Sequence, residues 1–96
     1  MLDKLSHSDF ENLEDKRFEI DFGEAGIVTA HLEKTSGFDL EADPGKREPF
    51  SIFLRCAGPP VQQTYPVTHD KLGKLDLFLV PIEENKEGVL FEAVFS

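Results

Sequence analysis

The chain has 96 residues, of which 40% are hydrophobic and 30% are charged, and its 19 acidic against 10 basic side chains give a net charge of -9. A chain of this length forms a single domain, which we expect over residues 1–96, and it can bury a core without a metal or a disulfide. The acidic balance argues against nucleic acid and anionic membrane surfaces as partners, because both bind clustered lysine and arginine, and the chain has no apolar run that could span a bilayer.

The cysteine content and the N-terminal residues bear on the compartment. The single cysteine, Cys56, cannot form an internal disulfide, and the first ten residues carry acids where a secretory leader has a basic and then an apolar region. We therefore expect a cytoplasmic protein.

Residues 5–16 form the one segment with a helical pattern. Ser6 or Ser8 can cap the helix, and Phe10 and Leu13 give it a partial apolar stripe. We expect one short amphipathic helix whose stripe covers an open end or face of a sheet.

Two segments with alternating apolar residues follow, at 17–22 and 27–35. This pattern is typical of strands with one buried and one exposed face. The glycines between the segments suit a hairpin, because glycine adopts positive φ at little cost. The register that places the apolar residues on one face pairs Phe22 with Val28.

Two later segments, 50–57 and 73–82, are apolar on both parities, which indicates strands buried on both faces near the centre of a sheet. Segment 64–69 can form only a short edge strand or an extended arm, because Pro66 has no amide hydrogen. The last strand is expected at 89–95.

Two polar segments separate these strands. Residues 36–48 include Pro44-Gly45, a pair suited to a type II turn, and residues 83–88 are rich in glutamate. We expect both to be surface loops.

The pattern of elements predicts a mainly β fold: a small antiparallel meander or barrel of five to six strands with one short N-terminal helix. Closure into a barrel would also remove exposed strand edges. There is no internal repeat and no linker, so the whole chain belongs to one unit.

No motif for metal, cofactor or nucleophilic chemistry is present. The three histidines show no metal-ligand spacing, and one cysteine cannot form a thiolate site. A nucleophile pair of Cys56 and His69 is conceivable, but Cys56 shares its strand face with apolar residues, where a thiol is usually an inert core residue. The sequence therefore predicts no metal site, no cofactor and no enzyme activity.

Five polar residues stand out as a possible interaction or structural cluster: Arg47, Glu48, Tyr65, His69 and Glu92. Each also has an ordinary structural role open to it. Arg47 and Glu48 can pin a loop, Tyr65 can pack as a ring with a hydrated hydroxyl group, and His69 can serve a turn.

Glu92 interrupts the apolar last strand, and pairing Ile82 with Val89 would surround it with leucines. A lone carboxylate there needs a cation or backbone amide hydrogens. We expect an arginine, Arg47 in preference to Arg55, in a structural ion pair rather than a ligand-binding site.

Three segments carry a family resemblance: KREPFS at 46–51, LFLVPI at 77–82 and FEAVF at 91–95. In their order and spacing the chain resembles a family of small bacterial proteins classed only as a domain of unknown function. One departure is Asp70, since a proline follows the histidine in the family pattern. The resemblance implies a bacterial source and, through neighbours that resemble phage-tail collar proteins, an accessory or assembly role. It implies no catalytic residues.

We expect a non-enzymatic interaction or assembly module with a protein partner, because the pattern is β-rich and offers no catalytic set. The alternative is a small-ligand-binding β-barrel. An apolar cavity of about 300 Å3 with convergent polar groups would favour the ligand, whereas a filled core with an exposed apolar patch would favour the protein partner. An enzyme would need a cleft with a strongly perturbed acid or base.

Overall fold

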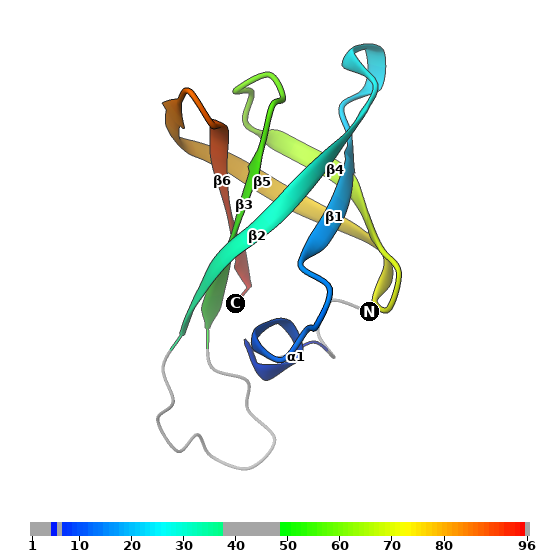
Figure 1. Ribbon diagram of the computed structural model, residues 1–96, viewed down its shortest axis with the longest axis vertical. Helices are drawn as coiled ribbons and strands as arrows, with labels where there is room; N and C mark the ends of the chain where they lie inside the picture. Colours follow the sequence, from blue (N-terminus) through cyan, green and yellow to red (C-terminus); the bar gives the residue numbers. More distant parts are fainter. Residues whose placement is uncertain (1–4, 6, 38–48, 96) are drawn as a thin grey trace.

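The structure, a computed structural model, describes residues 5, 7–37 and 49–95. Within these residues six antiparallel strands close into a barrel with the spatial order β1-β2-β3-β6-β5-β4, and one helix lies at one end (Figure 1). In chain order the elements are α1 (His7–Glu11), β1 (Arg17–Asp21), the 3-10 helix η2 (Gly23–Ala25), β2 (Ile27–Gly37), β3 (Phe50–Cys56), β4 (Gln63–His69), β5 (Gly73–Asn85) and β6 (Gly88–Phe95). The predicted mainly β fold with one short N-terminal helix is confirmed. No helix in the described ranges is long and apolar enough to traverse a bilayer.

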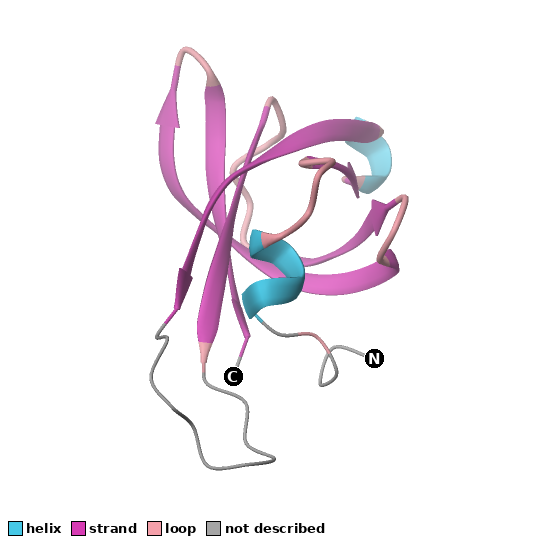
Figure 2. Cartoon of the chain, turned by 60° about the horizontal axis from the view of Figure 1, so that its bottom comes forward, coloured by secondary structure: helices cyan, strands magenta, loops and turns pink. Residues whose placement is uncertain are grey.

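Toward α1 the barrel divides into two sheets. β1 pairs with β2 only as far as His31, and β5 pairs with β6 only between Val80 and Asn85. Past those points β2 stays paired with β3 and β3 with β6, while β5 stays paired with β4. β4 is joined to β1 at Glu19 and Ile20, so β1, β4 and β5 lie on one side of the opening and β2, β3 and β6 on the other. The helix α1 lies across the opening between the two sheets (Figures 1 and 2).

Phe10 of α1 fills this opening. Its side chain is fully buried. Its ring centroid lies 6.4 Å from that of Phe18 in one sheet, and 5.8 and 5.2 Å from those of Phe50 and Phe95 in the other. Phe50 and Phe95 stack on each other with centroids 4.6 Å apart. One side chain therefore joins both sheets, at distances and tilts that aromatic pairs prefer.

The helix is shorter than predicted. It ends at Glu11 rather than at residue 16, because the chain turns there and the amide of Leu13 donates to the carbonyl of Phe10, three residues back. Leu13 is nevertheless buried, so the expectation that Phe10 and Leu13 cover an open end of the sheet is confirmed. A helix of 5 residues has little stability of its own and depends on this packing.

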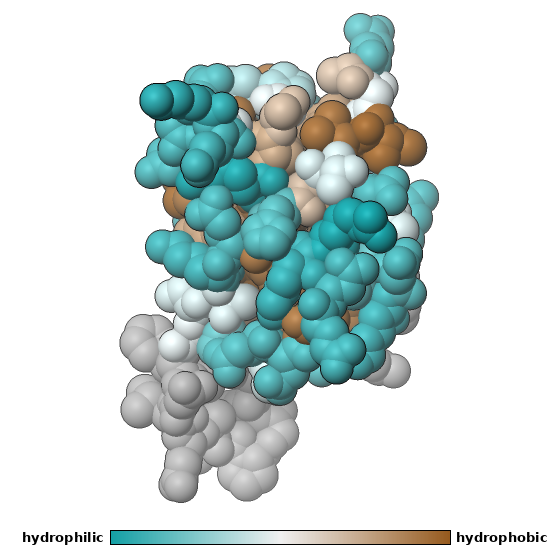
Figure 3. Space-filling view, viewed as in Figure 1, coloured by the Kyte–Doolittle hydropathy of each residue, from teal (hydrophilic) through white to brown (hydrophobic). Residues whose placement is uncertain are grey.

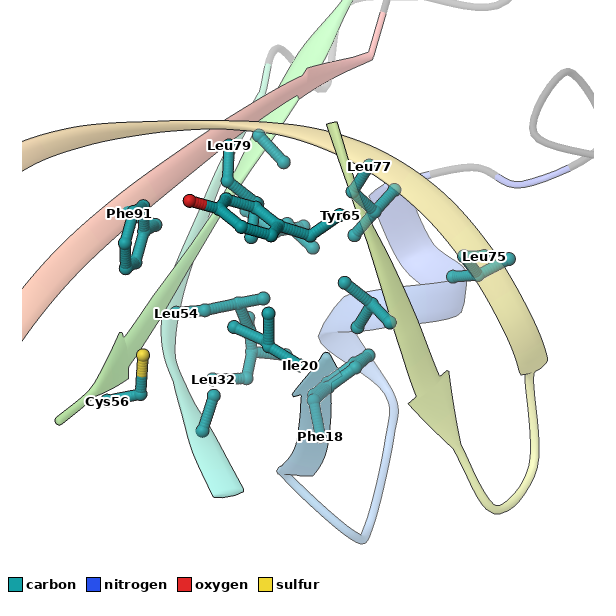
Figure 4. Close-up of a cluster of buried hydrophobic side chains, with 14 of the residues drawn as sticks. Phe18, Ile20, Leu32, Leu54, Cys56, Tyr65, Leu75, Leu77, Leu79 and Phe91 are labelled. Atoms are coloured by element: carbon teal, nitrogen blue, oxygen red, sulfur yellow. The ribbon is translucent and has the colours of Figure 1, made fainter. Parts of the chain in front are cut away.

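The interior of the barrel is filled with side chains from all six strands. Alternate residues point inward, and Figure 4 shows Ile20, Leu54 and Leu79 directed toward one another. At the end away from α1, Tyr65 packs edge-on against Phe22, with ring centroids 4.8 Å apart. An eight-stranded barrel is only wide enough for side chains or one small ligand, so six strands leave the interior to this core.

The prediction that segment 73–82 is buried on both faces is wrong. Leu77 and Leu79 point inward and are buried, but Phe78 between them is 52% exposed and Ile82 is 48% exposed. A closed barrel has one interior, so the apolar side chains of the other parity face outward.

The prediction that segment 50–57 is buried on both faces agrees better with the structure of β3. Its outward-facing Phe53 is 8% exposed, and the Nζ atom of Lys34 lies 4.8 Å from the ring centroid in a cation–π contact.

β4, predicted as an edge strand, is paired on both sides, with β5 throughout and with β1 at two positions. Pro66 lies one residue beyond the ladder with β1, so its missing amide hydrogen removes no bond from that ladder.

The first hairpin has the predicted faces but a register shifted by two residues. Ile20, rather than Phe22, stands opposite Val28. The amide of Phe22 instead donates to the carbonyl of Gly26 at 2.9 Å and closes the loop around η2. A shift of two residues keeps the same side chains inward, because the side-chain period of a strand is two.

The second hairpin differs from the predicted register by one residue, which changes the face. Val80 stands opposite Glu92, and an irregularity between Pro81 and Glu83 lets β5 continue through part of the predicted acidic loop to Asn85. Because successive strand residues point to opposite sides, Glu92 faces outward instead of joining the leucines.

Replacing Phe10 with alanine should lower the free energy of unfolding by about 3–5 kcal/mol, the usual range for truncating a buried phenylalanine. The loss is expected because a cavity opens where α1 joins both sheets. Urea denaturation followed by circular dichroism measures it, with Phe78→Ala as the control on an exposed ring, where the change should stay below about 1 kcal/mol. Equal losses in the two variants would contradict the packing role of Phe10.

Candidate functional site

His69 is a buried polar side chain, with 3% of its surface exposed. Its Nε2 atom lies 2.7 Å from the carbonyl oxygen of Asp15, which can only accept, so Nε2 carries the hydrogen. Its Nδ1 atom accepts hydrogen bonds from the backbone amides of Lys71 and Leu72, at 3.0 and 3.3 Å. The ring also packs against Phe18, with centroids 4.7 Å apart.

These contacts give His69 a structural role. The ring ties the segment that leads from α1 into β1 to the turn between β4 and β5. Both ring nitrogens are occupied by backbone groups, so neither is left for a metal or for proton transfer to a substrate.

Tyr65 is buried at the opposite end of β4. Its hydroxyl group donates to the carbonyl of Val61 at 2.6 Å, and burial raises the pKa of the phenol. The sequence suggested a hydrated hydroxyl group, but here the oxygen is bound to the loop between β3 and β4. Tyr65 therefore holds this loop over the end of the barrel.

Cys56 lies among core side chains with 4% of its surface exposed (Figure 4). Burial raises the pKa of the thiol, against a smaller opposing effect of a backbone hydrogen bond from Gly58. Cys56 pairs with Val89 at the end of the barrel away from α1, whereas His69 lies at the α1 end, so the two do not form a nucleophile pair. Within the described residues no group of three or more His, Cys, Asp and Glu is placed to hold a metal ion.

The five predicted polar residues do not come together as one site. Tyr65 and His69 serve opposite ends of β4, and Glu92 lies half-buried on the outer side of β6 beside Phe53 and Val80. The remaining two, Arg47 and Glu48, lie outside the described residues. The pairing of Glu92 with Arg47 therefore stays a prediction.

Arg55, the other predicted partner of Glu92, binds two different carboxylates. Its Nε atom donates to Glu33 at 2.5 Å and its Nη2 atom donates to Glu83 at 2.8 Å. Leu90 stands between Arg55 and Glu83 in the register of β3, β6 and β5, and it is buried although it faces outward. The guanidinium thus crosses β6 and covers Leu90.

This ion-pair network shifts the pKa values of Glu33 and Arg55 in the directions that favour their charged forms. Hydrogen bonding from Arg55 holds the pKa of Glu33 below its usual range, and the two carboxylates raise the pKa of Arg55. Sequence reasoning missed the network. The alternation of each strand already placed Glu33, Arg55 and Glu83 on the outer surface. Which of them are neighbours depends on the order of the strands and on the register shift of β2 at Glu33, and neither can be read from the sequence.

The outer surface of β2, β1, β4 and β5 combines apolar and acidic side chains. We call it the β1–β4 face, and it consists of the row Ile27, Asp21, Pro66 and Asp76, the row Thr29, Glu19, Thr68 and Lys74, and Phe78 next on β5. Six of these residues line a shallow depression of about 220 Å3. The front of Figure 3, where β1 and β2 lie, is mostly hydrophilic, with hydrophobic atoms gathered toward the η2 end.

Fold and site together define a class of protein: a small, acidic, six-stranded β-barrel domain whose open end is closed by one aromatic side chain of a short helix. The chain belongs to the family described as "Domain of unknown function (DUF6916)", which matches residues 5–95. No curated protein matches the chain, and no solved structure matches it.

Replacing His69 with leucine should lower the free energy of unfolding by about 2 kcal/mol or more, because backbone groups in the two joined segments lose their partner. Urea denaturation measures the loss. His31→Leu is the control, since His31 is exposed and its replacement should cost less than about 0.5 kcal/mol. The nitrogen chemical shifts of the wild-type ring should also show Nε2 protonated and Nδ1 bare. A ring protonated at Nδ1 alone, or a fully stable His69→Leu variant, would be incompatible with this role.

Proposed function

We propose that this domain is a non-enzymatic protein-interaction module that acts in an assembly. The observation that carries the proposal is the exposure of large apolar side chains on the outside of the barrel: Ile27, Val61, Phe78, Ile82 and Val94, with Ile27 at 67%. Four of the five stand on strands of the barrel, and exposed large apolar side chains are a kind of surface that protein partners bury.

The filled interior favours a binding site on the outer surface of the barrel over a binding site inside it. The buried side chains of all six strands form one cluster, and aromatic rings occupy both ends of the barrel. A small-ligand-binding barrel needs an apolar cavity with convergent polar groups. The buried polar groups found here, on His69 and Tyr65, are bound to backbone atoms instead.

The causes of the pKa shifts support a proposal that includes no catalysis. Shifted pKa values among the described residues belong to Glu33, Arg55, Cys56 and Tyr65. An ion pair on the outer surface accounts for the first two and burial in the core for the others. Structural ion pairs and burial shift pKa values without any catalytic role.

The setting of such a module follows from the sequence. The resemblance implies a bacterial source and an accessory role beside proteins similar to phage-tail collars, and the single cysteine suits a cytoplasmic location. We carry these over as part of the proposal.

Affinity capture from a lysate of the protein's own host, read by mass spectrometry, tests the proposal when two baits are compared. One bait is the wild-type chain, and the other replaces the exposed apolar residues in the variant Ile27→Thr, Phe78→Ser, Ile82→Thr and Val94→Thr. Protein partners should be retained by the first bait and lost with the second, while both baits keep the same circular dichroism spectrum.

Two results would count against the interaction module. The first is recovery of the same proteins from both baits, which would mean that the apolar outer surface recruits nothing. The second is a small molecule that stays bound to purified wild-type protein in native mass spectrometry, which would restore the ligand-binding barrel.

A further inference from the structure

β5 has an open edge where it parts from β6. Between Gly73 and Leu79 it pairs with β4 on one side only, and its nearest pair with β6 joins Val80 to Glu92. Figure 1 shows the two strands separating, with β6 running to the C-terminus and β5 leading back to the turn that follows β4. We call residues 73–79 of β5 the open edge.

Every second residue of the open edge directs its backbone groups away from β4. Asp76 stands opposite Pro66, which has no amide hydrogen, so these two form a pair without hydrogen bonds and the amide and carbonyl of Asp76 point away from β4. Lys74 and Phe78, two residues away on either side, point the same way. Within the described residues no strand pairs with these groups, and an unpaired edge of this kind accepts another extended strand.

The side chains at these positions define what that strand must carry. Phe78 is 52% exposed, and Lys74 and Asp76 are exposed without an ion pair or a side-chain hydrogen bond to any other described residue. Leu75 and Leu77, which alternate with them, are buried in the core. The outer side of the open edge thus offers a base, an acid and an aromatic ring in order along β5, while its inner side is already filled.

We propose that the open edge binds an extended segment of a partner protein, which adds to the sheet as an antiparallel strand and carries an apolar residue, a base and an acid at every second position. This inference rests on the proposed function and names the partner chemistry. The apolar residue stands opposite Phe78, the base opposite Asp76 and the acid opposite Lys74. The residues between them are small, because they face the filled core. The antiparallel direction follows the strand pairs of this barrel.

A second copy of the chain fits the open edge less well. Pairing two β5 strands about a two-fold axis at Leu75 would place Lys74 of each copy opposite Asp76 of the other. The ladder would then end at Leu77, because the turn of the other copy begins there, and Phe78 would gain no strand partner. Each copy also carries a net charge of -9, which opposes their approach.

The test is a titration of 15N-labelled protein with synthetic heptapeptides capped at both ends, followed by amide chemical shifts. The probe, SVSKSES, spans the open edge with valine opposite Phe78, lysine opposite Asp76 and glutamate opposite Lys74. One control, SVSESKS, has the same composition with its two charges exchanged. Two further peptides carry one N-methyl group on the probe, either on the lysine amide, which faces β5, or on the amide of the serine before it, which faces away.

The probe should shift the amides of the open edge and bind with a Kd below about 1 mM. The charge-exchanged peptide and the peptide methylated on lysine should bind at least about fivefold more weakly, whereas methylation on serine should change the Kd by less than about twofold. Phe78→Ser should weaken the probe at least about fivefold. Ile27→Thr is the matched control, because Ile27 is 67% exposed but lies on β2 in the other sheet, and it should leave the affinity unchanged.

A double variant exchanges the charges of the open edge itself. In the protein with Lys74→Asp and Asp76→Lys, the preference should reverse, so that SVSESKS binds at least about fivefold more tightly than SVSKSES. Both residues are exposed, so the fold should remain, which circular dichroism checks. An unchanged preference for SVSKSES would show that these side chains do not select the segment.

Three further results would overturn the inference. They are no binding of the probe, equal binding of all the peptides, and shifts at the open edge that appear on concentrating the protein alone, which would make the occupant a second copy. Partners that are captured by wild-type bait and lost with the apolar variant, together with any of these results, would leave the interaction module standing and move its site elsewhere.

Discussion

The packing of Phe10 against Phe18, Phe50 and Phe95 completes the core, because it fills the end of the barrel where two of the strand pairings stop. Toward the α1 end β2 continues past its pair with Arg17, the first residue of β1, and β6 continues past its last pair with β5, so the pairings between β1 and β2 and between β5 and β6 are missing there. A ring that contacts both sheets replaces them. His69 adds a second tie at the same end, since it binds the segment after α1 through Asp15. The short helix is thus stabilised by tertiary contacts and in return completes the core.

A narrow, filled barrel restricts where function can lie. With the interior occupied, the side chains free to meet another molecule are those of outward parity, and this chain places large apolar residues there. On the β1–β4 face they stand beside acids, whereas around Arg55 an ion-pair network joins β2, β3 and β5 and covers Leu90 of β6. The two outer surfaces therefore differ in kind. Around Arg55 the carboxylates of Glu33 and Glu83 are paired with the guanidinium, whereas on the β1–β4 face charged and apolar side chains are exposed to solvent.

The features that could be predicted from the sequence are those set by residues close together in the chain. The features that could not be predicted depend on contacts between residues far apart in the chain. Alternation fixed the faces of β1 and β2, but their register follows from the bond between Phe22 and Gly26, which alternation does not specify. Apolar residues on both parities of β5 are compatible with two structures, a strand buried on both faces and a barrel strand with exposed apolar residues on its outer side. The irregularity after Pro81 and the outward turn of Glu92 depend on pairing with β6. A role for His69 in a turn could be read locally, but its partner Asp15 is 54 residues away.

Native-state hydrogen exchange of the wild type and of Phe10→Ala tests most directly whether one ring holds the two sheets together. The amides to compare are the slowest ones in each sheet, such as those of Ile20 and Val67 on one side and Leu54 and Phe91 on the other. Loss of a shared contact should lower the opening free energy of both sets by the same amount, because they open as one cooperative unit. Unchanged protection in either sheet, with faster exchange confined to α1 and its neighbours, would contradict the role of Phe10.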